Sequence, residues 1–502
     1  MSDTPSTILK GEPMKPATTP TRQPHPRGLS TLFLTEMWER FSYYGMRSLL
    51  VLFMVDQVRG GPGLDDKTAT AIYGIYTAAV YLMSLPGGWL ADRICGARRA
   101  VWIGGLIIAA GHFTLAVPRM ETFYLGLVLV VVGSGLLKPN MSALVAELYP
   151  EGGARRDAGF TIFYMGVNLG AFLGPMVCSM LGEKVNWHYG FGAAGVGMVL
   201  GLIQFKLSVN RLGKAGLQRG NSRPLNTAER VGVGGLTAVL VVAVGLALAG
   251  FVKLNPLALA HGMAVMVLIV GGLYFLGVFL FCGLTVQEKE RVAVILVLFL
   301  ASALFWAGFE QAGSSFNLFA ERMTERHWLG WEIPAGWFQS LGAVFVIAFA
   351  PLFAALWVWL GRRNLDPSIP VKFAFGLFSL AAGFLVMAGA AVVVARGGRA
   401  APTWLVTTYL LHTFGELCLS PVGLSSVTKL APRKLVGQMM GLWFLATSLG
   451  NLIAGLLAGE FRADAMQEWP SLYLRIIIPP VVAGVLLVVF ARPIKRWLVG
   501  VK

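Results

Sequence analysis

The sequence predicts an all-α polytopic membrane protein, and three observations lead to this fold class. Of the 502 residues, 56% are hydrophobic and only 13% are charged, whereas soluble domains carry roughly 25% charged residues. Long uncharged runs such as 292–307 and 474–490, with their flanks, approach the roughly 20 residues that cross a bilayer as a helix. Lys and Arg gather in alternate short loops between such runs. We therefore expect lipid to surround most of the chain.

Apolar runs separated by charged residues, Pro or Gly indicate about fourteen transmembrane helices. The predicted spans are 28–57, 68–92, 99–117, 121–147, 158–181, 189–209, 230–251, 258–282, 291–319, 335–360, 371–395, 402–428, 434–458 and 472–491. An even number places both termini on one side of the membrane. The alternate loops carry basic clusters such as Arg362, Arg363 and Lys372, so the positive-inside rule makes that side cytoplasmic.

The spans divide into two groups of six around an inserted pair, as expected of alternating-access transporters built from two related halves. A single irregular bundle, as in a channel or a membrane enzyme, stays open on hydropathy alone. The predicted units are a disordered cytoplasmic tail (1–27), an N-terminal six-helix bundle (28–209), a cytoplasmic linker (210–229), an inserted helical hairpin (230–282), a C-terminal six-helix bundle (283–491) and a cytoplasmic tail (492–502).

Several other classes are disfavoured. The formal net charge is +16, but the basic residues lie in separate loops and form no continuous basic face, so we expect no nucleic-acid partner. The scattered cysteines suggest neither a disulfide framework nor a metal site; they are Cys95, Cys178, Cys282 and Cys418. The histidines are also scattered, and neither an HExxH nor a G-x-S-x-G motif occurs, so no enzyme is predicted.

The first span carries charges that a lipid-facing helix would not tolerate. Its polar residues are Glu36, Glu39, Arg40, Tyr43, Tyr44 and Arg47. At roughly 100° per residue their directions fall within an arc of about 140°, so they share one face. A charge facing lipid at mid-bilayer costs about 2.5–3.5 kcal/mol or more. This face should therefore turn toward a polar cavity or toward partners on other helices, although a purely structural network is an alternative.

Other spans supply complementary charges at comparable depth. Lys138 precedes Pro139 in the fourth span, and Glu310 lies in the middle of the ninth. Glu416 precedes the helix-breaking Pro421 in the twelfth. Because unpaired charges inside a membrane are costly, we expect the basic Arg47 and Lys138 to meet the acidic Glu310 and Glu416 across the two halves.

Neutral groups complete a predicted pocket, and they are Tyr76, Asn168, Trp306, Ser420 and Trp443. Each aromatic could instead serve packing or anchor a helix at the interface. Asn168 is the stronger candidate, because an amide inside lipid requires a specific partner. A cavity with an acidic pole and a basic pole separated by aromatics suits a zwitterion such as a free peptide, whose ends it would bind while tolerating different side chains.

Three motifs resemble the proton-dependent oligopeptide transporters, a family within the major facilitator superfamily. The segment from Glu36 to Gly45 (EMWERFSYYG) matches the long ExxERFxYYG signature, and Phe163–Gly170 (FYMGVNLG) is similar to the FYxxxNxG segment. Gly415–Pro421 (GELCLSP) looks like the motif of the tenth helix, and the pair at 230–282 resembles two extra helices of bacterial members. The resemblance covers nearly the whole chain after the tail.

The resemblance implies proton-coupled import of dipeptides and tripeptides through the bacterial cytoplasmic (inner) membrane, with protons and membrane lipid as further partners. It implies no cofactor or metal beyond the coupling proton, and a functional monomer. Proton coupling and gating are implied for Glu36, Glu39, Arg40, Lys138 and Glu310. Peptide binding is implied for Tyr43, Tyr44, Arg47, Tyr76, Lys138, Asn168, Trp306, Glu310, Glu416, Ser420 and Trp443.

One position departs from the family pattern. Gly342 stands where many members carry an Asn whose amide contacts the peptide backbone, and glycine has no side chain to supply this amide. Relatives that carry nitrate, histidine or plant metabolites make another solute the second hypothesis. A sensor on a transporter scaffold is the third. For the coupling step we expect protonation of Glu310 to release Arg47 to the peptide carboxylate.

Overall fold

The computed structural model describes residues 24–151, 153–217, 226–252, 254–432 and 434–497. The predicted tails and linker therefore lie largely or partly outside the described residues. Helices dominate this part of the chain, and ten of them are long and apolar enough to cross a membrane. The helices α1 and α13, which carry the charged motifs, are of comparable length at 28 and 29 residues. The predicted all-α polytopic fold class is confirmed.

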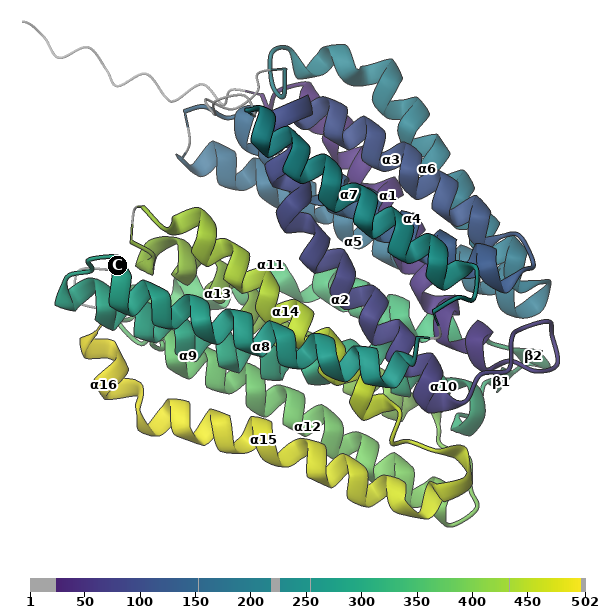
Figure 1. Ribbon diagram of the computed structural model, residues 1–502. Coiled ribbons are helices and arrows are strands. Elements are labelled where there is room, and N and C mark those ends of the chain that lie inside the picture. Colours follow the sequence, from purple (N-terminus) through teal and green to yellow (C-terminus); the bar gives the residue numbers. More distant parts are fainter. Residues whose placement is uncertain (1–23, 152, 218–225, 253, 433, 498–502) are drawn as a thin grey trace, which may run out of the picture.

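The first six helices form one bundle, drawn in purple and blue in Figure 1. They are α1 (Gly28–Val55), α2 (Asp66–Leu90), α3 (Ala97–Leu115), α4 (Met120–Glu147), α5 (Gly153–Lys184) and α6 (Trp187–Ser208), with the short helices η1 (Ala91–Cys95) and η2 (Val209–Leu212) after α2 and α6. Here α1 packs on α5 and α6, and α3 packs on α4. The α1–α5 crossing needs glycine, because a Cβ at Gly174 of α5 would overlap the backbone carbonyl oxygen of Phe41 in α1.

The second bundle contains the helices from α9 onward. These are α9 (Val286–Phe309), η3 (Glu310–Gly313), α10 (Ser315–Met323), η4 (Ala335–Gln339), α11 (Ser340–Arg362), α12 (Ile369–Ala395), α13 (Pro402–Leu430), α14 (Val436–Ala458), η5 (Ala463–Glu468), α15 (Trp469–Val489) and α16 (Ala491–Arg496). A small antiparallel hairpin of β1 (His327–Trp328) and β2 (Trp331–Glu332) joins α10 to η4. In this bundle α12 packs on α13 and α15, and α9 on α14.

Polar caps mark several points where the chain enters a helix. Asp65 accepts a hydrogen bond from the backbone N–H of Thr68 (3.0 Å) at the start of α2. Thr285 and Glu288 form a reciprocal capping box at the start of α9. Each cap satisfies backbone donors that the helix itself leaves free. Helix starts in this chain therefore follow local sequence as well as hydropathy.

The inserted pair of helices differs from the predicted hairpin in how it packs. Helix α7 (Thr227–Leu248) has α4 of the first bundle as its principal neighbour. Helix α8 (Pro256–Phe281) packs on α14 and on α2. Figure 1 accordingly shows α7 across the upper bundle and α8 along the lower one. The insert therefore spans both bundles, and its two helices do not run side by side.

Two local predictions also need correction. The predicted span 291–319 is not one continuous helix, because α9 ends at Phe309, and the 3-10 turn η3 separates it from α10. Glu310 thus lies at a helix break instead of in the middle of a helix. Conversely, Pro139 and Pro421 lie inside α4 and α13, and both helices continue past them. Neighbouring helices support a proline inside a membrane helix, so the residue alone does not end it.

The two bundles converge at the end that carries α10 and the β hairpin, and they lie farther apart toward α16 (Figure 1). We call the converging end the paired end. Among the residues that the structure describes, five ion pairs link the bundles there: Arg59–Glu321 (3.1 Å), Lys67–Glu460 (3.0 Å), Arg322–Asp66 (2.8 Å), Lys184–Glu332 (2.7 Å) and Arg326–Glu183 (3.9 Å).

A buried contact adds to these ion pairs. The carboxylate of Glu183 on α5 accepts hydrogen bonds from the backbone N–H groups of Ala335 (2.7 Å) and Gly336 (2.9 Å) in the other bundle. Exposed ion pairs contribute only about 0–1 kcal/mol each. Hydrogen bonds to a charged group are worth about 1.5–3 kcal/mol. The paired end is therefore held by several weak pairs around at least one stronger contact.

Candidate functional site

The ExxER segment of α1 forms a compact buried charge cluster. Arg40 Nε lies 2.8 Å from Glu36 Oε1 and 2.7 Å from Glu39 Oε2. All three side chains are at least 95% buried. Two carboxylates share one guanidinium, so this part of α1 carries a surplus negative charge. A further cation nearby would reduce the cost of burying it.

Lys138 on α4 is that cation. Its Nζ lies 3.7 Å from the ring centroid of Tyr81, a cation–π contact, and Glu39, Glu36 and Glu310 are within electrostatic range. In the part of the chain that the structure describes, Lys138 makes no direct ion pair. The expected direct pairing of Lys138 with Glu310 or Glu416 across the two halves is therefore wrong for this conformation. Lys138 interacts more strongly with Glu39 and Glu36 of α1, in its own bundle, than with Glu310.

Arg47 makes the predicted contact between the bundles. Its Nη2 atom lies 2.7 Å from Oε2 of Glu310, and both side chains are more than 90% buried. Arg47 projects from α1, whereas Glu310 projects from the η3 break between α9 and α10. A break of this kind frees backbone groups and exposes a side chain toward the bundle interface, as in the discontinuous helices of transporters. The ion pair therefore links the two bundles through a buried, titratable group.

Glu416 and Ser420 lie one turn apart on α13 and are half-buried. Glu310 is within electrostatic range of Glu416, and Glu416 is within range of Tyr44 and Tyr164 in the first bundle. In the described ranges Glu416 has no ion-pair partner. Its carboxylate thus remains available to a cation, which is what an acidic pole requires.

The predicted aromatics do not all lie at this interface. Tyr43 stacks on Tyr76 (6.3 Å between ring centroids), and the hydroxyl of Tyr76 has no hydrogen-bond partner among the described residues. The indole N–H of Trp306 is likewise without a partner in the described chain. Trp443 instead packs inside the second bundle, against Gly423 and Phe373. Tyr76 and Trp306 can therefore offer polar groups to a ligand, whereas Trp443 contributes mainly packing.

Asn168 does not find the interhelical partner that the sequence suggested. Its side-chain amide donates to the carbonyl oxygen of Tyr164, one turn earlier in α5 (2.9 Å). This hydrogen bond within its own helix satisfies one of the two N–H donors of the amide. At Gly342 on α11, a Cβ would meet no heavy atom within 4 Å. This helix face is therefore open where the family pattern has an amide.

The structure adds residues that sequence reasoning missed. Tyr73 on α2 accepts a hydrogen bond from Arg47 Nε (2.6 Å), and Tyr81 lies under Lys138. Tyr73, Tyr76 and Tyr81 share α2, but only Tyr76 was selected because tyrosine alone gives no sign of its partner. The break at Glu310 did have a signal, since Gly308, Gly313 and two serines surround it.

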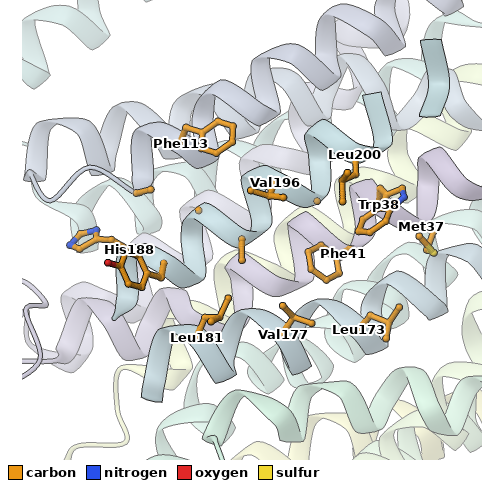
Figure 2. A pocket seen from close by; sticks show the side chains of 15 residues that line it. Met37, Trp38, Phe41, Phe113, Leu173, Val177, Leu181, His188, Val196 and Leu200 are labelled. Carbon is orange, nitrogen blue, oxygen red and sulfur yellow. The ribbon is translucent and has the colours of Figure 1, made fainter. Parts of the chain in front are cut away.

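A separate groove lies on the outside of the first bundle (Figure 2). It has a volume of about 840 Å³ and runs over α1, α3, α5 and α6, from His188 and Leu181 to Met37 and Leu200. Its lining is almost entirely apolar and includes none of the predicted charged residues. In a bilayer such a groove faces acyl chains, so we do not assign the ligand site to it.

Comparison with known proteins agrees with this geometry. Residues 98–468 match the model of the POT family. The chain belongs to the POT family. The peptide transporter YePEPT of Yersinia enterocolitica is 43% identical over 94% of this chain and 95% of its own length. A di-/tripeptide transporter of Lactococcus lactis is 35% identical over 95% of this chain and 97% of its own.

Solved POT-family structures show the same architecture. A mutant of a peptide transporter POT in complex with alafosfalin is 42% identical and superposes with a TM-score of 0.87, covering 95% of this chain and 96% of its own. The resemblance seen in the sequence motifs is thereby confirmed. These POT relatives are transporters, which confirms that the chain is a transporter and not an enzyme.

Proposed function

We propose that this POT-family protein is a symporter that imports dipeptides and tripeptides together with protons by alternating access. The observation that carries the proposal is the buried Arg47–Glu310 ion pair, which joins the two bundles at 2.7 Å. It combines a group that can bind a carboxylate with a group that can take up a proton. Competition between the two provides a direct route to coupling.

The polar groups match the two ends of a peptide. Glu416 has no cationic partner among the described residues and would bind the peptide ammonium group. Arg47, with Lys138 at greater distance, would serve the carboxylate. Tyr43 and Tyr44 lie on α1 with Arg47, Tyr76 stacks on Tyr43, and Trp306 lies on α9 one turn before Glu310. The printed names of the relatives, peptide transporter and di-/tripeptide transporter, support peptides as the substrate class.

Proton coupling follows from the same contact. Protonation of Glu310 removes its negative charge, which releases Arg47 to the peptide carboxylate; loss of the proton lets the ion pair form again. Each proton that enters down a 100 mV potential supplies about 2.3 kcal/mol. For a neutral zwitterion at one proton per peptide, this energy supports a ratio of internal to external concentration of about fifty. No cofactor other than the proton is required.

We further propose that the paired end faces outward. Both termini would then be cytoplasmic, in line with the basic loops, and the protein would lie in a bacterial inner membrane surrounded by lipid. Because the ligand groups come from the two bundles of one chain, a monomer contains the whole site. In this orientation the bundles are closed toward the outside and spread toward the cytoplasm.

Uptake by liposomes that contain purified protein tests the acidic pole. Under an inward proton gradient, we expect uptake of labelled dialanine, competition by unlabelled dialanine, and little competition by N-acetyl-dialanine, nitrate or free histidine. Glu416→Gln should abolish uptake because the neutral amide does not hold the ammonium group. Glu468→Gln, an exposed change in η5 of the second bundle, is the matched control. Equal uptake by Glu416→Gln and wild type would refute this pole, and uptake of nitrate or histidine alone would refute the substrate class.

A further inference from the structure

Arg47 is held by more than its ion pair. Its Nε donates to the hydroxyl of Tyr73 at 2.6 Å, and its guanidinium lies 5.6 Å from the ring centroid of Tyr44 and 5.7 Å from that of Tyr73. A guanidinium is planar, and its five N–H donors point in fixed directions. A hydrogen bond at Nε therefore fixes the plane in which the two terminal nitrogens can meet an acceptor.

The fixed plane leaves the contact with Glu310 incomplete. Although Nη2 is 2.7 Å from Oε2 of Glu310, that oxygen has no hydrogen bond of acceptable geometry from any described residue. The strongest arginine–carboxylate pairs are bidentate and use two parallel N–H groups. Here the edge formed by Nε and Nη2 is unavailable, because Nε is already bonded to Tyr73. Arg47 and Glu310 therefore form a close ion pair that is not bidentate.

The position of Tyr73 depends on the segment that carries Glu310. Tyr73 is fully buried, and its hydroxyl lies against Gly313, where an added Cβ would collide with the phenol oxygen. Gly313 ends the same η3 turn that begins with Glu310. Tyr73 of the first bundle thus packs between Arg47 and the helix break of the second bundle. The space that its hydroxyl occupies exists only because residue 313 is a glycine.

We propose that Tyr73 is a positioning residue that keeps the Arg47–Glu310 pair single-contact and exchangeable, so that a substrate carboxylate can take Arg47. The inference rests on the proposed function, in which Arg47 serves the carboxylate pole. Without the hydroxyl, Nε turns to Glu310 and completes a bidentate pair. The substrate then competes with a stronger internal partner, and its affinity falls.

Two ligands that differ only at the carboxylate test this role. Binding of dialanine and of its C-terminal amide is measured by competition for wild type, Tyr73→Phe and Tyr473→Phe. Tyr473 is the matched control, because it is also fully buried and its hydroxyl has no partner among the described residues. One additional charge-assisted hydrogen bond to Glu310 corresponds to a loss of about tenfold or more in affinity for dialanine. Affinity for the amide should not change in any of the three proteins.

A merely structural role gives a different pattern, in which both ligands lose affinity equally or the amount of active protein falls. Gly313→Ala should reproduce the selective loss, since it displaces the phenol without removing it. Equal affinities of Tyr73→Phe and wild type for dialanine would overturn the proposal. A structure of Tyr73→Phe in which Arg47 keeps a single contact with Glu310 would also overturn the proposal. This structural result does not depend on peptide binding, so it remains decisive even if wild type binds no peptide and the proposed function fails.

Discussion

Replacing Glu310 by glutamine tests the link between proton and substrate movement. The substitution preserves the shape of the side chain but removes its titratable group and its charge. In wild type a potential of 100 mV supplies about 2.3 kcal/mol per proton, which corresponds to an about fiftyfold accumulation at one proton per peptide. In Glu310→Gln no proton is exchanged at this position, so the accumulation ratio should fall to about one, the value without coupling.

Two assays on the same liposomes separate coupling from binding. The first measures the steady-state ratio of internal to external dialanine under a proton gradient. The second measures exchange of labelled for unlabelled dialanine at equal pH, which needs no net proton movement and should persist in Glu310→Gln. Glu460→Gln is the control, because Glu460 also pairs with a cation of the other bundle but its side chain is 56% exposed. Accumulation by Glu310→Gln to the wild-type ratio would refute this reasoning.

Three further predictions concern other parts of the molecule. Gly342→Asn places an amide where the helix face is open, and one added hydrogen bond should improve dialanine affinity about fivefold in competition assays; an unchanged or weaker affinity would contradict this. Arg322→Gln removes the bidentate contact with Asp66 (both N–O distances 2.8 Å). Spin labels on the two bundles at the paired end should therefore report a larger population of molecules in which the bundles are separated there. An unchanged distance distribution would show that this contact does not hold the bundles together. Burial raises the pKa of Asp56, but hydrogen bonds from the Trp187 indole and three backbone N–H groups outweigh this effect and lower the pKa. The stabilising effect of Asp56 is therefore fully present above the ordinary aspartate value of about 4 and is lost as pH falls through the lowered pKa. The difference in melting temperature between wild type and Asp56→Asn should accordingly be larger at pH 6 than in acid and should shrink as pH falls below about 4; a difference that stays constant with pH would contradict this.

The membrane fold could be predicted from the sequence because hydropathy and loop charge act over whole segments. Each apolar run needs lipid or another helix around it, so the spans were found even where their ends shifted by several residues. The packing of α7 and α8 could not be predicted in this way. Helices of equal hydropathy can lie against either bundle, and the choice depends on surfaces that only the folded chain presents.

The site shows the same division between chemistry and geometry. The cost of buried charge identified Arg47 and Glu310 as partners, and the structure brings them together. The same reasoning paired Lys138 with the second bundle, but Lys138 makes no direct ion pair among the described residues, because Glu39 and Glu36 on α1 interact with it more strongly than Glu310 does. Tyr73 was missed since its importance depends on a hydrogen bond to Arg47 and on the space at Gly313, neither of which a tyrosine reveals in the sequence.

The most direct test of the central claim measures both transported species at once. Wild-type protein in liposomes receives an inward proton gradient with equal dialanine on both sides, while labelled dialanine and internal pH are followed together. The account predicts that internal dialanine rises above the external concentration and that dialanine accelerates acidification of the interior. Contradiction would come from dialanine that stays at the external concentration throughout, with acidification at the same rate whether or not dialanine is present.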